Sequence, residues 1–292
     1  QRRSLWYTIL SPERFFWRKK HKTERHGQSM SIVQNIKKTI NYSRKNGYKE
    51  AVLAAWERMT ARYYADYTYQ SLTEQELDRQ REDKTLDTIC FSLIVPAFET
   101  HRNHLTDLIA SCLAQTYGNW ELILADGSKS EGVSAVMAQY EDPRIHYIRL
   151  QENGGISENT NQALAYATGD YCGLVDHDDM LTPDALYEMA SAITRAKAEG
   201  RVKPVLLYSD EDKCNAEGNR FYDPHIKQDF NLDLILTNNY ICHLCVVETQ
   251  TIQKLLIRKQ YDGAQDYDLV LRIVSSLLLR ERENAASGKV ED

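Results

Sequence analysis

Acidic residues follow three short apolar runs, and they are the first candidates for chemistry in this chain. The three acidic groups are Asp126-Gly127-Ser128, Asp176-His177-Asp178-Asp179 and Ser209-Asp210-Glu211-Asp212. Carboxylates brought together repel one another unless a proton or a cation lies among them. Carboxylate oxygens are also ligands that Mg²⁺ and Mn²⁺ favour. If the three runs end at one edge of a sheet, the sequence predicts a divalent-cation site there.

Residues 176–179 have a simpler alternative interpretation, a solvated loop ahead of a helix that Thr182-Pro183 begins. They are not an EF-hand loop, because Met180 and Leu181 stand where that loop needs an oxygen ligand and a glycine. No Gly-x-Gly-x-x-Gly follows the first apolar run, and no P-loop motif occurs. These motifs therefore give no support to NAD or P-loop chemistry.

Cys242 and Cys245 have the spacing of a zinc half-site, with His243 between them. No second Cys/His pair stands nearby in the sequence, and the stretch has the pattern of a strand. We therefore expect no zinc at this position.

Short apolar runs alternate with helical periodicity from residue 88 onward, which predicts βαβ units and an α/β fold with a mostly parallel sheet flanked by helices. The predicted strands are 90–95, 121–125, 145–149, 171–175, 205–208 and 240–247, and the predicted helices are 103–116, 130–140, 157–168, 183–199 and 266–280. Ligands of such sheets bind beyond the carboxyl ends of the strands. The acidic groups follow those ends.

The composition is that of a globular protein. Of 292 residues, 42% are hydrophobic and 27% are charged, and six cysteines are scattered along the chain. Sparse cysteines do not form a disulfide framework. No apolar run approaches the roughly 18 residues of a membrane span, and no secretion signal opens the chain. We therefore expect a cytoplasmic protein.

The charge is distributed unevenly. Residues 1–50 hold 13 of the 36 Lys and Arg residues but 3 of the 42 Asp and Glu residues, so the rest carries a net charge of −16. An acidic body argues against nucleic acid as a partner. Residues 1–30 place aromatic rings beside basic residues, a pattern that suits a membrane surface but equally suits packing on a neighbouring domain.

The part before residue 88 has helical patterns. Apolar spacing predicts helices over 31–46 and 51–63, and Thr73-Glu74-Gln75-Glu76 resembles a capping box that opens a helix to about Lys84. We interpret residues 1–87 as a basic, aromatic segment with a helical extension, and residues 88–292 as the α/β domain.

The ordered motifs of residues 88–275 resemble those of family 2 glycosyltransferases of the GT-A fold. They are 91–98, Gln115-Thr116-Tyr117, Trp120-Glu121-Leu122, Asp126-Gly127-Ser128, Asn153-Gly154-Gly155-Ile156-Ser157, Asn161, Ala167-Thr168-Gly169-Asp170 and Asp176-His177-Asp178-Asp179. Three later stretches, 208–213, 238–244 and 263–269, look like the bacterial rhamnosyltransferase-like branch, which builds cell-surface polysaccharides. Each motif is weak alone, but the ordered set is specific.

The resemblance implies a donor site for a UDP- or dTDP-sugar and a divalent metal, Mn²⁺ or Mg²⁺. The implied nucleotide-binding residues are Pro96, Ala97, Phe98, Glu99, Asp126, Asn153, Gly154 and Asp176. Asp178, with Asp176, is the implied metal ligand. The metal neutralises charge that develops on the leaving nucleoside diphosphate.

The resemblance also implies an inverting, single-displacement transfer of a hexosyl or rhamnosyl group to a saccharide or lipid-linked acceptor. Asp266 is the candidate base that takes the acceptor proton. Without the resemblance, Asp266 reads more simply as a carboxylate that complements a helix dipole. Residues expected beside the donor or acceptor sugar are Asp210, Glu211, Asp212, Asn239, His243 and Gln265.

The chain departs from the family pattern in two places. The loop 126–129 is one residue shorter than usual, which leaves base selectivity open. The strand with a late His that follows the Asp266 helix in relatives is absent before Asp292, so we expect the domain to be truncated at its C-terminus.

Two rival functions stay open at this point. The first is an inactive or partner-dependent nucleotide-binding domain of a larger polysaccharide-assembly protein, and the second is an interaction protein that acts through residues 1–84. A lipid-linked acceptor and the basic segment 1–30 together predict a peripheral position at the inner membrane face.

Overall fold

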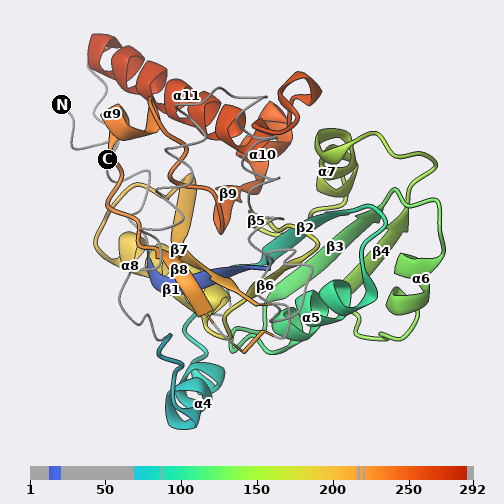
Figure 1. Ribbon diagram of the computed structural model, residues 1–292. Helices are drawn as coiled ribbons and strands as arrows, with labels where there is room; N and C mark the ends of the chain where they lie inside the picture. The colour runs from blue at the N-terminus through green and yellow to red at the C-terminus, as the bar shows by residue number, and fades with distance from the viewer. Residues whose placement is uncertain (1–12, 21–68, 87, 216–217, 220, 288–292) are drawn as a thin grey trace, which may run out of the picture.

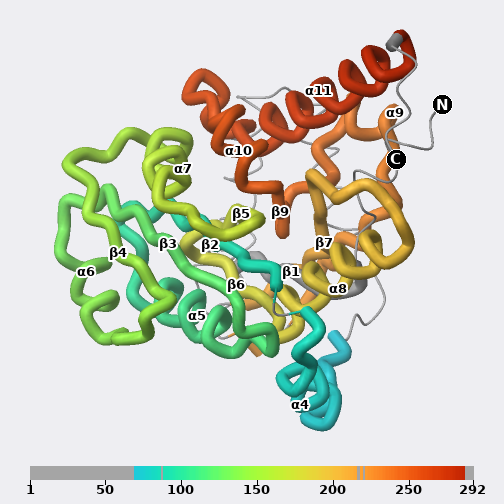
Figure 2. Tube along the Cα trace, turned by 180° about the vertical axis from the view of Figure 1, so that it is seen from behind, coloured from blue at the N-terminus to red at the C-terminus, as the bar shows by residue number. Residues whose placement is uncertain are grey.

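A computed structural model describes residues 13–20, 69–86, 88–215, 218–219 and 221–287. Within these residues one mixed sheet forms the centre, with the strand order β4-β3-β2-β5-β9-β7-β1-β6 and with β8 paired to β7 (Figure 1). Helices cover both faces (Figure 2). The α/β prediction is confirmed.

Four parallel strands make one half of the sheet. They are β2 (Phe91–Ala97), β3 (Trp120–Asp126), β4 (Ile145–Arg149) and β5 (Tyr171–Leu174). The strands β2 and β3 are almost wholly buried because both faces are covered. On β2, Leu93 and Val95 face one core and Ile94 faces the other, as the alternation of a strand requires.

Each core has its own helices. The helices α5 (Arg102–Leu113), α6 (Gly132–Met137) and α8 (Ala185–Ala198) pack on one face of the sheet. The opposite face carries α7 (Ile156–Leu164), α10 (Thr249–Leu255) and α11 (Gln265–Ser287). Figure 1 and Figure 2 show α10 and α11 above the sheet and α5 below it. The carboxyl edge between these layers stays accessible.

The other half of the sheet is mixed. Its strands are β9 (Cys245–Glu248), β7 (Leu206–Cys214), β8 (Phe221–His225), β1 (Glu13–Lys20) and β6 (Asp179–Leu181). The pairs β5–β9, β7–β9, β7–β8 and β1–β6 are antiparallel, whereas β1 and β7 are parallel. The parallel arrangement expected for most of the sheet therefore holds from β4 to β5 and gives way to antiparallel pairing at β9.

The sequence located most elements of the α/β part. The strand expected at 145–149 has these bounds, but the strand expected at 240–247 starts only at Cys245, because residues 240–244 form a loop in which Cys242 has a φ of 40°. The strand expected at 205–208 continues to Cys214, because β1 and β8 pair with its second half. The sequence patterns did not predict β1, β6, β8, α10 or the short helix α9 (Leu232–Ile235).

The capping-box prediction is confirmed. Helix α4 (Glu74–Glu82) begins after Thr73, whose side chain accepts from the Glu76 backbone while Glu76 accepts from Thr73. The Thr116 Oγ1 donates to Gln80 of this helix, so α4 is tied to the α/β domain. The helices expected at 31–46 and 51–63 and most of the basic segment 1–30 lie outside the described residues. The domain boundary at 87/88 stays a prediction.

None of the described helices is both long enough and apolar enough to span a bilayer.

The stretch Ala167-Thr168-Gly169-Asp170 locks the start of β2 to its neighbours. Glu121 Oε1 accepts from Ser92 Oγ at 2.6 Å and from the Thr168 backbone at 2.7 Å. The Gly169 backbone donates to Ser92 Oγ at 2.9 Å. A Cβ on Gly169 would lie 2.7 Å from the Cys90 carbonyl oxygen and 2.9 Å from the Ser92 nitrogen. The close backbone approach therefore requires glycine.

We predict that Gly169→Ala lowers the free energy of unfolding by about 1–3 kcal/mol, because backbone atoms of β2 cannot yield to the new methyl group. Urea unfolding measures the change. Gly118→Ala is the matched control, since a Cβ on Gly118 meets nothing within 4 Å, and its effect should stay within about 0.5 kcal/mol. Equal effects of the two substitutions would contradict the packing argument.

Candidate functional site

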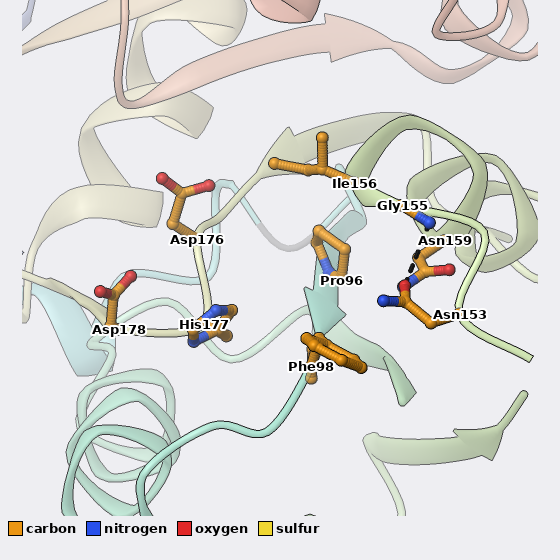
Figure 3. Close-up of a pocket in the computed structure, with 10 residues that line it drawn as sticks. Pro96, Phe98, Asn153, Gly155, Ile156, Asn159, Asp176, His177 and Asp178 are labelled. Carbon is orange, nitrogen blue, oxygen red and sulfur yellow. Dashed lines mark hydrogen bonds between the residues drawn. The ribbon is translucent and has the colours of Figure 1, made fainter. Parts of the chain in front are cut away.

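A pocket of about 310 Å³ opens at the carboxyl edge of the parallel strands (Figure 3). Its lining consists of Pro96, Ala97, Phe98, Asn153, Gly155, Ile156, Asn159, Asp176, His177 and Asp178. Figure 3 shows Asp176 and Asp178 at one side and Asn153 and Asn159 at the other, with Pro96 and Phe98 between them. The pocket therefore has an acidic end and an amide end.

The amide end is built by a short loop and the start of α7. Asn153 Oδ1 accepts from the Gly155 backbone at 3.0 Å and from Asn159 Nδ2 at 2.9 Å. Asn159 Oδ1 accepts from the Gly154 backbone at 3.1 Å. Gly155 has a φ of 92°, a conformation that side chains disfavour. The two asparagines thus fix the loop that bounds the pocket, and Gly154 supports it from outside the lining.

Two predicted nucleotide-binding carboxylates lie behind the pocket rather than in its lining. Asp126 is fully buried, and its carboxylate accepts from the Ser128 backbone at 2.8 Å, Tyr147 Oη at 2.7 Å and Arg149 Nη1 at 2.8 Å. Glu99 accepts from Ser130 Oγ at 2.6 Å and from two backbone N–H groups, and these bonds lower the pKa of its carboxyl. Both residues therefore hold the loop after β3.

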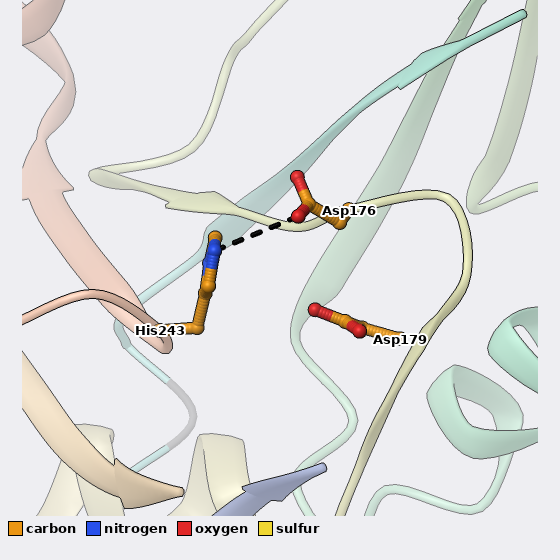
Figure 4. Close-up of side chains that lie close together, drawn as sticks. All are labelled: Asp176, Asp179 and His243. Carbon is orange, nitrogen blue, oxygen red and sulfur yellow. Dashed lines mark ion pairs between the residues drawn. The ribbon is translucent and has the colours of Figure 1, made fainter. Parts of the chain in front are cut away.

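The acidic end brings together two carboxylates and an imidazole. Ligand atoms of Asp176, Asp179 and His243 lie within 4.8 Å of one another, and these side chains point toward the same space (Figure 4). His243 Nε2 lies 3.6 Å from Asp176 Oδ2. Asp179 is fully buried, whereas Asp176 has 30% of its side chain exposed. Asp178 lines the pocket but is not in this group.

The loop before β9 carries both His243 and Asn239. Asn239 Nδ2 donates to Asp266 Oδ2 at 2.9 Å. Asp266 lies in the first turn of α11, as the sequence predicted, and is partly exposed. Gln265 accepts from the Gly263 backbone at 2.7 Å and so helps to start the helix. One loop therefore reaches both Asp266 and the acidic end of the pocket.

The acidic residues of β7 have protein partners. Glu211 Oε1 lies 2.9 Å from His225 Nδ1, and Asp210 Oδ1 accepts from the Lys227 backbone at 2.7 Å. Asp210 and Asp212 are buried, with 4% and 1% exposed. These three residues lie outside the pocket lining, so their contact with a sugar stays a prediction.

Cys242 and Cys245 form no disulfide. Cys242 Sγ donates to the Asn239 carbonyl at 3.1 Å, and Cys245 is buried in the core. Burial raises the pKa of the Cys245 thiol to about 12. A neutral thiol is a poor metal ligand.

The site residues assigned from the sequence do not include five that the structure places at this site, namely Gly155, Ile156, Asn159, His177 and Asp179. His177 and Asp179 belong to the acidic run 176–179, but the sequence of this run did not indicate which of its side chains lie at the site. Asn159 stands three residues after Ile156, so it lies near the same face of α7 as this lining residue.

The family model "Glycosyl transferase family 2" matches residues 92–255. The chain belongs to this family.

Relatives support the same family. A protein of Sinorhizobium fredii named "Uncharacterized protein y4gI" is 36% identical over 67% of this chain and 21% of its own length. The O-antigen biosynthesis protein RfbC of Myxococcus xanthus is 32% identical over 62% of this chain and 14% of its own length. The putative colanic acid biosynthesis glycosyl transferase WcaA of Escherichia coli is 30% identical over 57% of this chain and 60% of its own length. The chain thus spans between a seventh and three fifths of these proteins.

The family 2 glycosyltransferase has the GT-A fold predicted from its motifs. The S. aureus protein TarS (residues 1–349), solved in complex with UDP, aligns with a TM-score of 0.47 and 19% identity over 62% of this chain and 54% of that one.

Asp266 and Asp268 differ in their surroundings, although both stand in the first turn of α11. Asp268 is 9% exposed and bonds to the guanidinium groups of Arg258 and Arg272. The bonds from Arg258 in particular hold the pKa of Asp268 below its ordinary value of 3.8. Asp268 is therefore a structural anchor at the start of α11 in this glycosyltransferase.

We predict that Asp268→Asn lowers the free energy of unfolding by about 1–3 kcal/mol at pH 7, because charge-assisted bonds are lost. A folded pKa below the unfolded value stabilises the fold above about pH 3.8, and this gain disappears as the pH falls toward the folded pKa. The difference between wild type and variant should therefore shrink between pH 5 and pH 3 in urea unfolding. A difference independent of pH would contradict this assignment, and Asp266→Asn, which loses no Arg partner, is the control.

Proposed function

We propose that this family 2 domain transfers a sugar from a nucleoside-diphosphate sugar to a saccharide or lipid-linked acceptor with inversion at the anomeric carbon. The observation that carries the proposal is the loop before β9, which brings Asn239 to Asp266 and His243 to Asp176. A candidate base and a candidate metal-binding group are thus joined through a few residues. Displacement at one carbon needs both functions close together.

The pocket is our proposed nucleotide site. Five of the residues expected there, Pro96, Ala97, Phe98, Asn153 and Asp176, line it. Phe98 is 42% exposed, and a ring presented to the pocket suits stacking on a planar base. Glu99 and Asp126 support this site from behind. Asp126 is fully buried, so a direct bond from its carboxylate to a base would require neighbouring atoms to move.

A divalent cation fits the group formed by Asp176, Asp179 and His243, with Asp178 beside it in the pocket lining. Two carboxylates are suitable ligands for Mg²⁺ or Mn²⁺, and the imidazole makes Mn²⁺ the better match. The cation would neutralise the charge that develops on the leaving diphosphate. The sequence assigned the ligand role to Asp178, and the geometry supports Asp179 in addition.

Asp266 is our proposed general base. Its carboxylate would accept the proton of the acceptor hydroxyl while the new bond to the anomeric carbon forms and the bond to the diphosphate oxygen breaks. Asn239 donates to one carboxylate oxygen and so orients the group. Because a single in-line displacement forms no covalent enzyme intermediate, the anomeric configuration inverts.

The relatives suggest a biological class. RfbC is named for O-antigen biosynthesis and WcaA for colanic acid biosynthesis. We propose that this chain likewise contributes a hexosyl or rhamnosyl residue to a cell-surface polysaccharide, in the cytoplasm where nucleotide sugars are supplied. Contact with the inner membrane face through residues 1–30 belongs to the same proposal.

We predict that Asp266→Asn lowers kcat by about 10²- to 10⁴-fold, because the acceptor hydroxyl loses its base. The affinity for UDP should change less than about twofold, since Asp266 lies outside the nucleotide pocket. Release of nucleoside diphosphate from a donor panel measures kcat, and calorimetry measures UDP affinity. Asp233→Asn, at an exposed aspartate of α9, is the control. An active Asp266→Asn would rule out this base.

We predict that nucleotide binding depends on Mn²⁺ through Asp179. In a thermal-shift titration with UDP, dTDP and GDP, the melting temperature should rise with one nucleotide when Mn²⁺ is present, because ligands that bind the folded state stabilise it. EDTA or Asp179→Asn should abolish most of the rise. An equal rise without Mn²⁺ would contradict the metal assignment. Binding without donor turnover would favour the partner-dependent nucleotide-binding domain.

A further inference from the structure

Lys227 is a buried lysine next to the loop that the proposed function depends on. It lies between β8 and α9, is 5% exposed, and is the one Lys or Arg residue classed as buried in the described part of the chain. Its Nζ donates to the Ile241 carbonyl at 2.5 Å and to the His243 carbonyl. The ammonium group thus bonds two carbonyls of one short backbone segment.

Burial of an ammonium group is costly unless polar partners replace its water. The two carbonyls supply such partners, and Lys227 is further fixed by its backbone bond to Asp210 Oδ1 at 2.7 Å. Burial lowers the pKa of Lys227, while the nearby carboxylates of Glu211 and Asp210 oppose that shift. Packing of the aliphatic stem alone does not account for an ammonium group buried at this position.

The segment that Lys227 holds is also fixed at its end. Leu244 N donates to Ser209 Oγ at 3.1 Å, and Ser209 N donates to the Leu244 carbonyl at 3.2 Å. Between these anchors and α9, the loop sends Asn239 to Asp266 and His243 to Asp176. The position of both side chains therefore depends on the backbone path of residues 239–244.

We propose that Lys227 is a positioning residue, whose bonds to the Ile241 and His243 carbonyls set the loop so that His243 faces Asp176 and Asn239 faces Asp266. This inference rests on the proposed function for its catalytic meaning. It also gives Asp210 a role, since Asp210 fixes the backbone of Lys227 from β7. Lys227 itself would touch neither the sugar nor the metal.

The test compares Lys227→Met, which keeps an apolar stem but removes the donors, with Lys213→Met. Lys213 is the matched control, because it is on the neighbouring strand β7 and pairs with the exposed Asp223. Three properties are measured: the affinity for MnCl₂ in the presence of UDP, the amide hydrogen exchange of residues 239–244, and donor turnover. The affinity reports on the metal site. The exchange reports on the loop and needs neither metal nor turnover.

In Lys227→Met we expect Mn²⁺ affinity to fall about 10- to 100-fold, the range for partners that orient a metal ligand. Exchange of residues 239–244 should accelerate, and donor turnover should fall through kcat more than through KM. Lys213→Met should leave all three unchanged. Lys227→Gln, which keeps amide donors without the charge, should recover part of the affinity and serves if Lys227→Met does not fold.

Unchanged exchange in residues 239–244 of a folded Lys227 variant would overturn the inference. Faster exchange with unchanged Mn²⁺ affinity would also overturn it, because the loop would then move without affecting His243. If wild type binds no Mn²⁺, the metal part of the proposed function is wrong. The exchange data then decide the role of Lys227 alone.

Discussion

Repulsion among carboxylates is the constraint on which the organisation of this chain depends. Acidic residues end β3, follow β5 and lie in the second half of β7, and the fold brings these residues toward one edge of the sheet. Several of them face cationic or basic groups of the protein, as Asp126 faces Arg149 and Glu211 faces His225. Asp176 faces His243, and this imidazole, like that of His225, carries charge only when protonated. In the proposed function, a divalent cation would add positive charge among these carboxylates.

The loop before β9 links this electrostatic arrangement to reactivity. Its residues reach the first turn of α11 on one side and the turn after β5 on the other. Anchors at Lys227 and Ser209 lie outside the pocket lining, so the loop is fixed by the fold rather than by residues of the pocket. In the proposed transfer, such a loop holds the base Asp266 and the metal-binding group in a fixed relative position. Preorganisation of this kind reduces the cost of aligning reactants.

Local sequence patterns predicted the parallel half of the sheet because β2, β3 and β5 are short, almost wholly buried runs, and β4 is a short run with apolar residues. Six of the residues assigned through the family motifs line the pocket. The choice between Asp178 and Asp179 was beyond the local patterns, since Asp178 lies in the turn after β5 whereas Asp179 begins β6. That choice depends on β6, which pairs with β1 across more than 150 residues of sequence. Lys227 was missed for the same reason, because its contacts arise from long-range packing.

The most direct test is the position of Mn²⁺ in crystals grown with UDP or whichever nucleotide binds, located by anomalous scattering. The account predicts an anomalous peak within bonding distance of His243 Nε2 and of a carboxylate oxygen of Asp176 or Asp179, with the nucleotide in the pocket beside Phe98. A peak bonded to Asp178 and distant from both Asp179 and His243 would contradict the account. Bound nucleotide with no manganese peak would contradict it as well.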